Sequence, residues 1–406
     1  MRLLKIWDAE YPWDVRAEKV MRSLTAGGHE VHLVARNRNG SPVTEKLEEA
    51  TVHRLAPWPW LGRGFDAASQ FPAFMNPRWI KHVHSTAKRQ GVEAILVRDL
   101  PLAPTAVWVS RRLGVPVILD MAENYPAMIR DIWTSGRQGG LDWIVRNPSL
   151  VSRVEKWTVR AVDHVIVVVE ESGERLVELG VEPSRVTVVC NTPWPSRIPE
   201  AHAPPSPSGE ELRFVYLGLL EKPRGLDAVL GGLTELRNEG LSSHLHVIGG
   251  GRDTELFKSE ADRLGFTDAT IRFHGVLPYD QALQIIAEAD IGLVPHLAVE
   301  SWNTTIPNKL FDYMSHGLPV VTSDAEPAAR IVREEDCGFV FASDDPGDFA
   351  QAVRGLRDPG VRERMGANGR NAVRSKYNWE VDGARLLETL ELVRARYVGG
   401  RKPSSP

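Results

Sequence analysis

The chain has 406 residues, 42% of them hydrophobic, which is enough for two domains that each bury a core. Its 49 Lys and Arg residues nearly balance its 53 Asp and Glu residues, so it lacks the concentrated basic charge with which proteins bind a nucleic-acid backbone. The two cysteines, Cys190 and Cys337, lie far apart with no CxxC motif, which argues against a zinc site or disulfide framework and favours the reducing cytoplasm.

The first half of the chain alternates short apolar segments with helices. A strand is predicted at 3–7, followed by an amphipathic helix from Val15 to Ala26 that Gly27 and Gly28 end. Further strands are predicted at 30–35, 94–97, 116–120 and 163–169. Apolar strands separated by helices predict a parallel sheet covered on both faces. No apolar segment is long enough to span a bilayer or to serve as a signal peptide, so we expect a soluble protein.

The alternation stops at a proline-rich segment and then starts again. We predict a first domain over 1–195, a linker over 196–210 and a second domain over 211–379, with a C-terminal helix at about 380–400 that joins the first domain. Strands of the second domain are predicted at 212–218, 245–251, 270–275, 290–295, 318–323 and 338–341. The expected fold is therefore α/β, with two Rossmann-like domains that face each other across a ligand-binding cleft.

The second domain contains two glycine-rich strand ends. Its first strand ends at Gly218, and Arg224 and Gly225 open the next helix, which is typical of an anion site; a solvated turn with an incidental arginine explains the segment equally well. The next strand ends in a glycine triplet that includes Gly250, where a tight turn capped by Asp253 is the alternative.

A third segment combines a polar loop with a helix start. Thr304 and Thr305 precede Pro307, the predicted first helical residue, and Lys309 and Asp312 follow one turn apart. The helix start and the lysine suit a diphosphate, and the carboxylate suits ribose hydroxyls. The segment therefore predicts a sugar-nucleotide site.

These motifs together resemble the retaining glycosyltransferases of family 4, which have the two-domain GT-B fold. Gly218, Arg224 and Gly225 match the pattern G-x5-[KR]-G, and residues 312–321 match [ED]-x-[ML]-x-x-G-x-P-V-[IV]. The element PNKLFDY at 307–313 matches a branch of the family that acts on amino-deoxy sugars. The resemblance covers most of residues 212–390.

The chain departs from the family pattern at two positions. Leu219 stands where an arginine usually follows the first glycine, and Thr304 stands where the first of two glutamates is usual. We interpret both departures as features of the branch, in which Arg224 and Lys309 share the charge of the diphosphate.

The first domain resembles the family less closely. Its first loop carries Asp14 and Arg16, which either bind the acceptor or pair with each other as a salt bridge, and we favour the salt bridge. Asp120, Glu123 and Pro126 match the pattern D-x-x-[DE]-x-x-P. The acidic residues would orient the acceptor hydroxyl or stabilise positive charge at the anomeric carbon; the alternative is that they complement a helix N-terminus.

The resemblance implies transfer of a sugar, with retention of configuration, from a nucleoside-diphosphate sugar to a glycan or lipid-linked acceptor. A UDP-sugar is favoured, and the absence of a suitably placed D-x-D motif predicts that no metal or other cofactor is needed. The implied catalytic residues are Glu123, Arg224 and Lys309. The implied donor-binding residues are Gly218, Gly250, Thr304, Thr305, Asn308 and Asp312. The implied acceptor-binding residues are Asp14, Arg16 and Asp120.

Two other functions are compatible with this architecture. A non-catalytic nucleotide-sugar-binding protein would explain Leu219 and Thr304, and a non-hydrolysing 2-epimerase would need a denser set of acidic residues with a histidine in the cleft. His244 and His246 share a strand face, but no third metal ligand is evident in the sequence.

Aromatic residues and arginines gather in two segments of the first domain. They are Trp58, Trp60, Phe65, Phe71, Phe74 and Trp79 at 56–84, and Trp133, Trp143 and Trp157 at 128–157. Trp and Arg together suit a membrane interface, although core packing explains them equally well. The membrane interpretation predicts a protein of surface-glycan assembly that contacts the inner face of the cell membrane.

Overall fold

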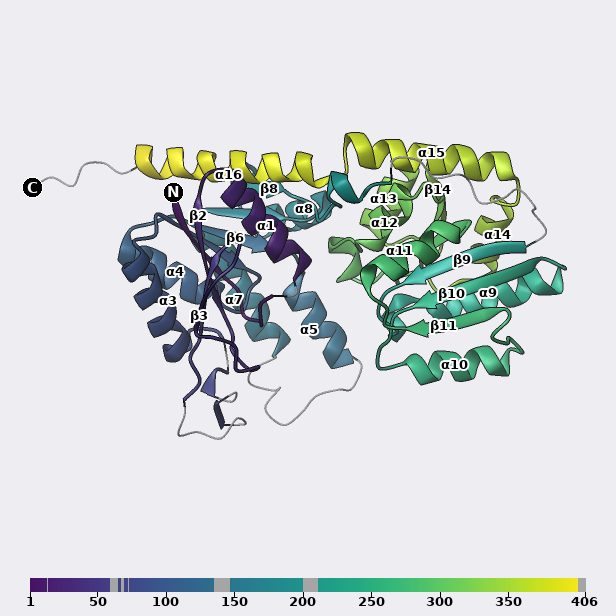
Figure 1. Ribbon diagram of the computed structural model, residues 1–406, viewed down its shortest axis with the longest axis horizontal. Coiled ribbons are helices and arrows are strands. Elements are labelled where there is room, and N and C mark those ends of the chain that lie inside the picture. The colour runs from purple at the N-terminus through teal and green to yellow at the C-terminus, as the bar shows by residue number, and fades with distance from the viewer. Residues whose placement is uncertain are drawn as a thin grey trace, which may run out of the picture. The chain divides into compact units, whose positions relative to one another are not determined.

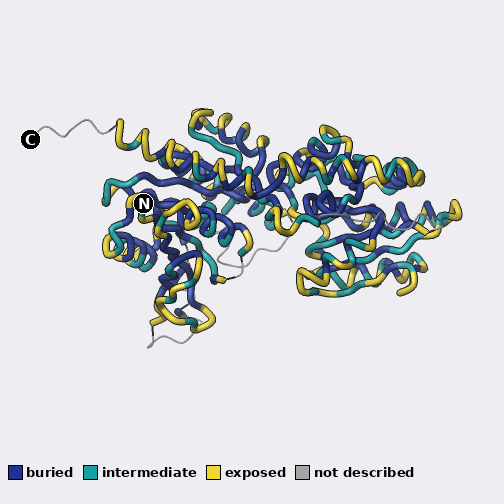
Figure 2. The backbone as a smooth tube through the Cα atoms, turned by 45° about the horizontal axis from the view of Figure 1, so that its top comes forward, coloured by how far each residue is buried: buried dark blue, intermediate teal, exposed yellow. Residues whose placement is uncertain are grey.

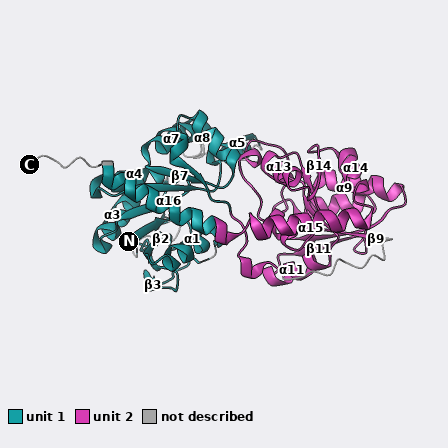
Figure 3. Cartoon of the chain, turned by 90° about the horizontal axis from the view of Figure 1, so that it is seen from above, with its two compact units in different colours: residues 1–190, 382–406 teal, residues 191–381 magenta. Residues whose placement is uncertain are grey.

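The computed structural model describes residues 1–12, 14–58, 65–66, 69–71, 73–134, 147–199 and 211–400. The chain divides into two compact units (Figure 3). Unit 1 comprises residues 1–190 and 382–406, and unit 2 comprises residues 191–381. Most of the predicted linker, 200–210, lies outside the described residues.

Unit 1 is built on an eight-stranded sheet in which β3 alone runs antiparallel to its neighbour (Figure 1). Its strands are β1 (Arg2–Ile6), β2 (Glu30–Ala35), β3 (Thr44–Lys46), β4 (Thr51–Arg54), β5 (Ala94–Arg98), β6 (Val117–Met121), β7 (His164–Val167) and β8 (Val186–Val188). Their order is β3-β4-β2-β1-β5-β6-β7-β8. At the centre of the sheet β1 pairs with β5, and Leu4 lies opposite Ile95.

Helices cover both faces of this sheet, because right-handed crossovers place a helix according to the direction in which the chain moves along the sheet. One face carries α3 (Pro77–Gln90), α4 (Ala103–Leu113), α7 (Pro148–Ala161) and α8 (Glu170–Glu178). The other carries α1 (Val15–Ala26) and α16 (Trp379–Gly400), and α5 (Tyr125–Thr134) packs on α7. Apolar residues of the strands, including Ile95 and Leu119, pack against Trp79 and Val107. The central strands of this sheet are buried, whereas β3 at its edge is largely exposed (Figure 2).

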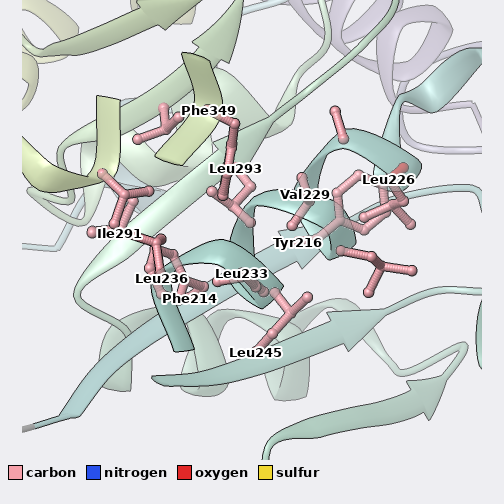
Figure 4. Close-up of a cluster of buried hydrophobic side chains, with 14 of the residues drawn as sticks. Phe214, Tyr216, Leu226, Val229, Leu233, Leu236, Leu245, Ile291, Leu293 and Phe349 are labelled. Carbon is pink, nitrogen blue, oxygen red and sulfur yellow. The ribbon is translucent and has the colours of Figure 1, made fainter. Parts of the chain in front are cut away.

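Unit 2 contains a six-stranded, fully parallel sheet. Its strands are β9 (Glu211–Leu217), β10 (Ser242–Ile248), β11 (Ile271–Gly275), β12 (Ile291–Val294), β13 (Val320–Ser323) and β14 (Gly338–Phe341), in the order β11-β10-β9-β12-β13-β14. Its helices are α9 (Leu226–Asn238), α10 (Thr254–Arg263), α11 (Tyr279–Glu288), α12 (Lys309–Ser315), α13 (Glu326–Glu334), α14 (Pro346–Arg354) and α15 (Pro359–Ser375). Figure 4 shows the main apolar cluster, in which Phe214 and Leu245 of the sheet meet Val229, Leu233 and Phe349.

The predicted pair of parallel α/β sheets is confirmed. The sequence did not predict β3, β4 or β8, which have three or four residues and, in β3 and β4, polar sequences. Such short segments become strands through pairing with neighbours and not through their own apolar pattern. The helix expected to start at Pro307 starts two residues later, at Lys309.

Each sheet has a point at which the strand order reverses, and open α/β sheets bind ligands at the carboxyl ends of the strands there. In unit 2 this point lies between β9 and β12, where the chain continues to Gly218 and to His296. In unit 1 it lies between β1 and β5, where the chain continues to Trp7 and Asp99.

A close backbone contact joins the two segments at the reversal point of unit 2. Gly225 has a φ of 72°, and a Cβ atom there would lie 1.7 Å from the carbonyl oxygen of Pro295. Only glycine permits both the left-handed conformation and this approach.

We predict that Gly225→Ala destabilises the protein more than Gly240→Ala does, by about 1–3 kcal/mol of unfolding free energy, because an added methyl group overpacks only the first site. Gly240 also has a positive φ, 86°, but has open space around the Cβ position, so its substitution costs only the backbone strain of about 1–2 kcal/mol. Urea unfolding followed by far-UV circular dichroism measures both. Equal losses in the two variants would contradict the contact with Pro295.

Candidate functional site

The amine of Lys309 lies at the reversal point of unit 2. Lys309 is the first residue of α12, and its side chain extends to the end of β9, where Nζ lies 3.7 Å from the ring centroid of Tyr216 and 3.2 Å from the Cβ position of Gly218. A side chain at residue 218 would crowd this amine, so the glycine leaves space beside it.

This amine is buried, and it has no hydrogen-bond partner among the described residues. Burial lowers the pKa of Lys309 well below its usual value, and repulsion from Arg224 lowers it further. A buried amine without a partner costs free energy unless a ligand supplies one, and an anion is the ligand that restores the charged form.

The guanidinium of Arg224 is held between two rings. Arg224 ends a short 3-10 helix, η3 (Lys222–Arg224), and its Cζ lies 4.3 Å from the ring centroid of Trp302, in η4 (Trp302–Thr304). Its Nη1 lies 3.4 Å from Nε2 of His296, and the rings of His296 and Trp302 are 4.0 Å apart. The guanidinium therefore stacks on the Trp302 ring and donates a hydrogen bond to the His296 imidazole.

His296 is fully buried beside this guanidinium. Burial lowers the pKa of its imidazole well below the usual value, and Lys309 and Arg224 lower it further by repulsion. The imidazole is therefore neutral at pH 7, as a ring that accepts a hydrogen bond from arginine must be.

A tyrosine donates a hydrogen bond to the carboxylate of Asp312. The hydroxyl of Tyr279, the first residue of α11, lies 2.7 Å from Asp312 Oδ1, and the guanidinium carbon of Arg197 lies 5.3 Å from the Tyr279 ring centroid. Burial raises the pKa of Tyr279, and the carboxylate raises it further, so the phenol remains a donor. The carboxylate is thus oriented from an element other than its own helix.

The other predicted donor residues lie in η4, in the loop before α12 and after β10. Thr304 is buried, and its hydroxyl donates to the Glu300 carbonyl at 2.9 Å, while Thr305 is also buried. Asn308 is exposed and accepts a hydrogen bond from Asn191 at 2.9 Å. The carbonyl of Gly250 accepts from the Leu220 amide at 3.2 Å, beside the end of β9.

A buried charge network lies at the reversal point of unit 1. Arg16 donates to Asp120 Oδ1 at 2.7 Å, and Lys5 donates to Oδ2 at 3.2 Å. Arg16 also donates to the carbonyls of Val189 and Cys190. Burial alone would raise the pKa of Asp120, but the surrounding cations, Arg16 first, hold it well below its usual value. Arg16 and Asp120 are 2% and 1% exposed, so they hold the edge of the sheet together and have little surface to offer a ligand.

The expected salt bridge between Asp14 and Arg16 is wrong, because each residue has another partner. Asp14 is the N-cap of α1, accepts from the Ala17 amide at 2.6 Å and pairs with Arg98. Arg16 lies two residues further on, where the helix turns its side chain toward Asp120.

Glu123 is exposed just after β6, at the same edge of the unit 1 sheet. The amide of Ala127 at the start of α5 donates its hydrogen bond to Asn124 Oδ1, at 3.1 Å. The neighbouring Asp99 has a φ of 56° and accepts from the Ala122 amide at 2.9 Å.

Several residues that contact the predicted site residues were not themselves predicted from the sequence. They are Lys5 and Arg98 in unit 1 and Tyr216, Tyr279, His296 and Trp302 in unit 2. The sequence could have indicated only two of them, Arg98 and His296, because they lie at or just beyond the carboxyl ends of predicted strands. Ring stacking and pairing across elements leave no spacing pattern in a sequence.

His244 and His246 on β10 lie beside a third histidine, His274, on β11. His246 Nδ1 lies 2.9 Å from His274 Nε2, and the ring of His244 stacks on that of His246 at 4.4 Å. Nevertheless, the described residues contain no group of three or more His, Cys, Asp or Glu side chains placed to hold a metal ion. In the part of the chain that is described, no helix is both long and apolar enough to cross a membrane.

Two protein-family models match the chain. Residues 14–192 match the glycosyl transferase 4-like domain, and residues 211–358 match the glycosyl transferases group 1 domain. One curated relative, a phosphatidyl-myo-inositol mannosyltransferase from Mycobacterium leprae (strain TN), is 30% identical over 181 residues. The match covers 44% of this chain and 46% of that relative, so the chain spans about half the length of the relative.

Solved structures of low sequence identity share the fold. A sucrose-phosphate synthase from Thermosynechococcus elongatus has a TM-score of 0.74 at 16% identity, with coverage of 98% of this chain and 99% of that one. Anabaena Alr3699/HepE, in complex with UDP, has a TM-score of 0.71 at 14% identity, with coverage of 97% and 100%. The two family matches and these structures support a GT-B protein of the group 1 glycosyltransferase type.

We predict that Asp120→Asn lowers the free energy of unfolding at pH 7 by about 3–5 kcal/mol, because it leaves buried cations without their counter-ion. The folded pKa of Asp120 lies below the unfolded value of about 3.9, so its contribution is fully present above that pH and is lost as the pH falls through the folded pKa. The difference between wild type and variant should therefore shrink below about pH 4.

Glu48→Gln is the matched control, because Glu48 pairs with Arg22 at 2.9 Å while its side chain is 80% exposed. Its substitution should cost about 1 kcal/mol or less. Urea titrations of wild type and both variants at several pH values measure these differences. An equally small cost for Asp120→Asn would show that the network does not stabilise unit 1.

Proposed function

We propose that this chain, whose halves match the 4-like and group 1 glycosyl transferase families, transfers a sugar from a nucleoside diphosphate to a glycan or lipid acceptor. The observation that carries the proposal is the Lys309 amine, buried at the reversal point of unit 2 with no hydrogen-bond partner among the described residues. Stability alone gives no reason to bury such a group, whereas binding of an anion does.

The diphosphate is the anion that this site suits. Arg224 offers planar N–H donors and Lys309 a compact charge, and the two cations lie close enough for Arg224 to lower the pKa of Lys309. The N-terminus of α9, immediately after Gly225, adds backbone N–H groups. Leu219, where relatives of this type usually have another cation, is 51% exposed and apolar, so Lys309 takes that role.

The ribose and sugar would be bound by neighbouring polar groups. Asp312, oriented by Tyr279, accepts hydrogen bonds from ribose hydroxyls. Thr304, Thr305 and Asn308 lie on the loop before α12 and face the transferred sugar, and the turn at Gly250 lies beside the nucleoside. UDP is the favoured nucleotide, because HepE, with the same fold, is known in complex with UDP.

The reaction breaks the bond between the anomeric carbon and the β-phosphate oxygen, and the electron pair goes to that oxygen. The acceptor hydroxyl oxygen forms the new bond on the same face of the sugar, and its proton passes to the departing diphosphate. Arg224 and Lys309 stabilise the charge that develops on the diphosphate, so the mechanism needs no metal ion.

Unit 1 would supply the acceptor site. Glu123 is exposed at the carboxyl edge of the sheet, where it orients the acceptor hydroxyl or stabilises positive charge at the anomeric carbon. Asp14 and Arg98 lie at the same edge. Arg16 and Asp120 support this edge through their buried pair.

A lipid acceptor is favoured by the surface of unit 1. Helices α3, α4 and α7 lie side by side, and their exposed charged residues are all basic: Lys81, Lys88, Arg89, Arg111, Arg112, Arg153, Lys156 and Arg160. The one acidic residue on these helices, Glu155, is buried and paired with Arg175 at 2.7 Å. Trp157, 47% exposed, lies in the same surface, whereas Trp79 belongs to the core, and Trp60 and Trp143 lie outside the described residues. This basic face suits the headgroups of anionic lipids at the inner face of the cell membrane.

We predict that one nucleoside diphosphate among UDP, GDP, ADP and dTDP raises the melting temperature, with and without EDTA, and that Arg224→Ala and Asp312→Ala reduce the shift. Lys309→Met should also reduce it while raising the melting temperature of the free protein, because it removes a buried amine without a hydrogen-bond partner, which costs about 1–3 kcal/mol. Lys258→Ala, on exposed α10, is the control.

A shift that needs metal would contradict the metal-free mechanism, and no shift with any nucleotide would contradict the donor site. Binding without product formation, when nucleotide sugars are offered with lipid and glycan acceptors, would instead indicate the non-catalytic binding protein.

We predict that the protein sediments with vesicles containing phosphatidylglycerol and stays in solution with phosphatidylcholine alone. Charge reversal at Arg111 and Arg112 should weaken binding roughly tenfold or more, whereas reversal at Lys258 and Arg263 of α10, an equal change of charge in unit 2, should leave it unchanged. Complete recovery of wild type in the supernatant would exclude this contact.

A further inference from the structure

In the proposed donor site Arg224 shares the diphosphate with Lys309, which comes from a different segment, α12. The side chain of an unsupported arginine has several rotatable bonds, and fixing them at the moment of binding costs affinity.

Two residues from separate segments contact its guanidinium. Trp302, at the start of η4, covers a face of the group at 4.3 Å, and His296, two residues after β12, accepts from Nη1 at 3.4 Å. The two rings also contact each other at 4.0 Å, so each supports the position of the other. The carbonyl of His296 in turn accepts a hydrogen bond from the Ser323 hydroxyl, which ties this backbone to β13.

This arrangement matches the geometry of guanidinium. Its N–H groups point outward in the plane of the group, so a ring stacked on the face occupies none of the donors. His296 accepts a hydrogen bond from one edge. The neutral imidazole can hold this edge without repelling the cation, as a protonated imidazole would.

We infer that Trp302 and His296 are positioning residues, which hold Arg224 in the orientation that binds the donor diphosphate. This inference rests on the nucleotide site proposed above. Neither ring needs to touch the nucleotide, and both act through the guanidinium.

The test uses a pair of substitutions at Trp302 and measures UDP affinity by calorimetry on the full-length protein. Trp302→Phe keeps an aromatic face and should bind UDP within about threefold of wild type, whereas Trp302→Leu keeps only apolar bulk and should bind roughly tenfold more weakly. His296→Asn, which keeps a neutral acceptor, should bind more tightly than His296→Leu.

A double-mutant cycle separates positioning from general packing. In an Arg224→Ala background, Trp302→Leu should change UDP affinity no further, because the group that it orients is absent. An equal loss of affinity in both backgrounds would overturn the inference. If Trp302→Leu does not fold, Trp302→Met takes its place in the same cycle with the same expected results.

The Arg224→Ala variant separates a failure of the proposed donor site from a failure of the positioning role alone. Unchanged UDP affinity in that variant would refute the donor site itself. Weakened binding in Arg224→Ala, together with full affinity in Trp302→Leu, would retain the donor site and refute only the positioning role.

Discussion

The buried amine of Lys309, which has no hydrogen-bond partner in the part of the chain that is described, is the constraint on which the proposed site in the second unit depends. The tight approach of Gly225 to Pro295 brings the segments after β9 and β12 together, and α12 then directs the lysine into the space beside Gly218. Burial and the nearby Arg224 both disfavour its charge, so the free protein keeps a site that is electrostatically incomplete. An anion completes it, which connects an unfavourable feature of the fold to the proposed binding of a diphosphate.

The corresponding position in the first unit is organised in the opposite way. Asp120 is buried there and paired with both Arg16 and Lys5, so its carboxylate has cationic partners within the protein. Glu123 is exposed at the same edge of the sheet, where Asp14 also pairs with Arg98. In the proposed function the second unit would bind the charged donor and the first unit the acceptor hydroxyl.

The proposed donor site accounts for the departure at Leu219. Lys309 would supply the cation that Leu219 does not, and the hydroxyl of Tyr279 orients the carboxylate of Asp312. Both residues are distant in the sequence from the positions they support, so the departure at Leu219, considered alone, suggests a weakened site.

The sequence by itself determined the two parallel sheets, since apolar strands alternating with amphipathic helices leave few other arrangements. It also made Gly218, Arg224, Lys309 and Asp312 candidate site residues, through local spacing and a family resemblance. It did not determine the partners of these residues. The different partners of Asp14 and Arg16, the stack of Trp302 on Arg224 and the burial of Lys309 depend on which strand ends become neighbours. Strand order brings together residues more than a hundred positions apart, such as Lys5 and Asp120, and no local pattern records a contact of that range.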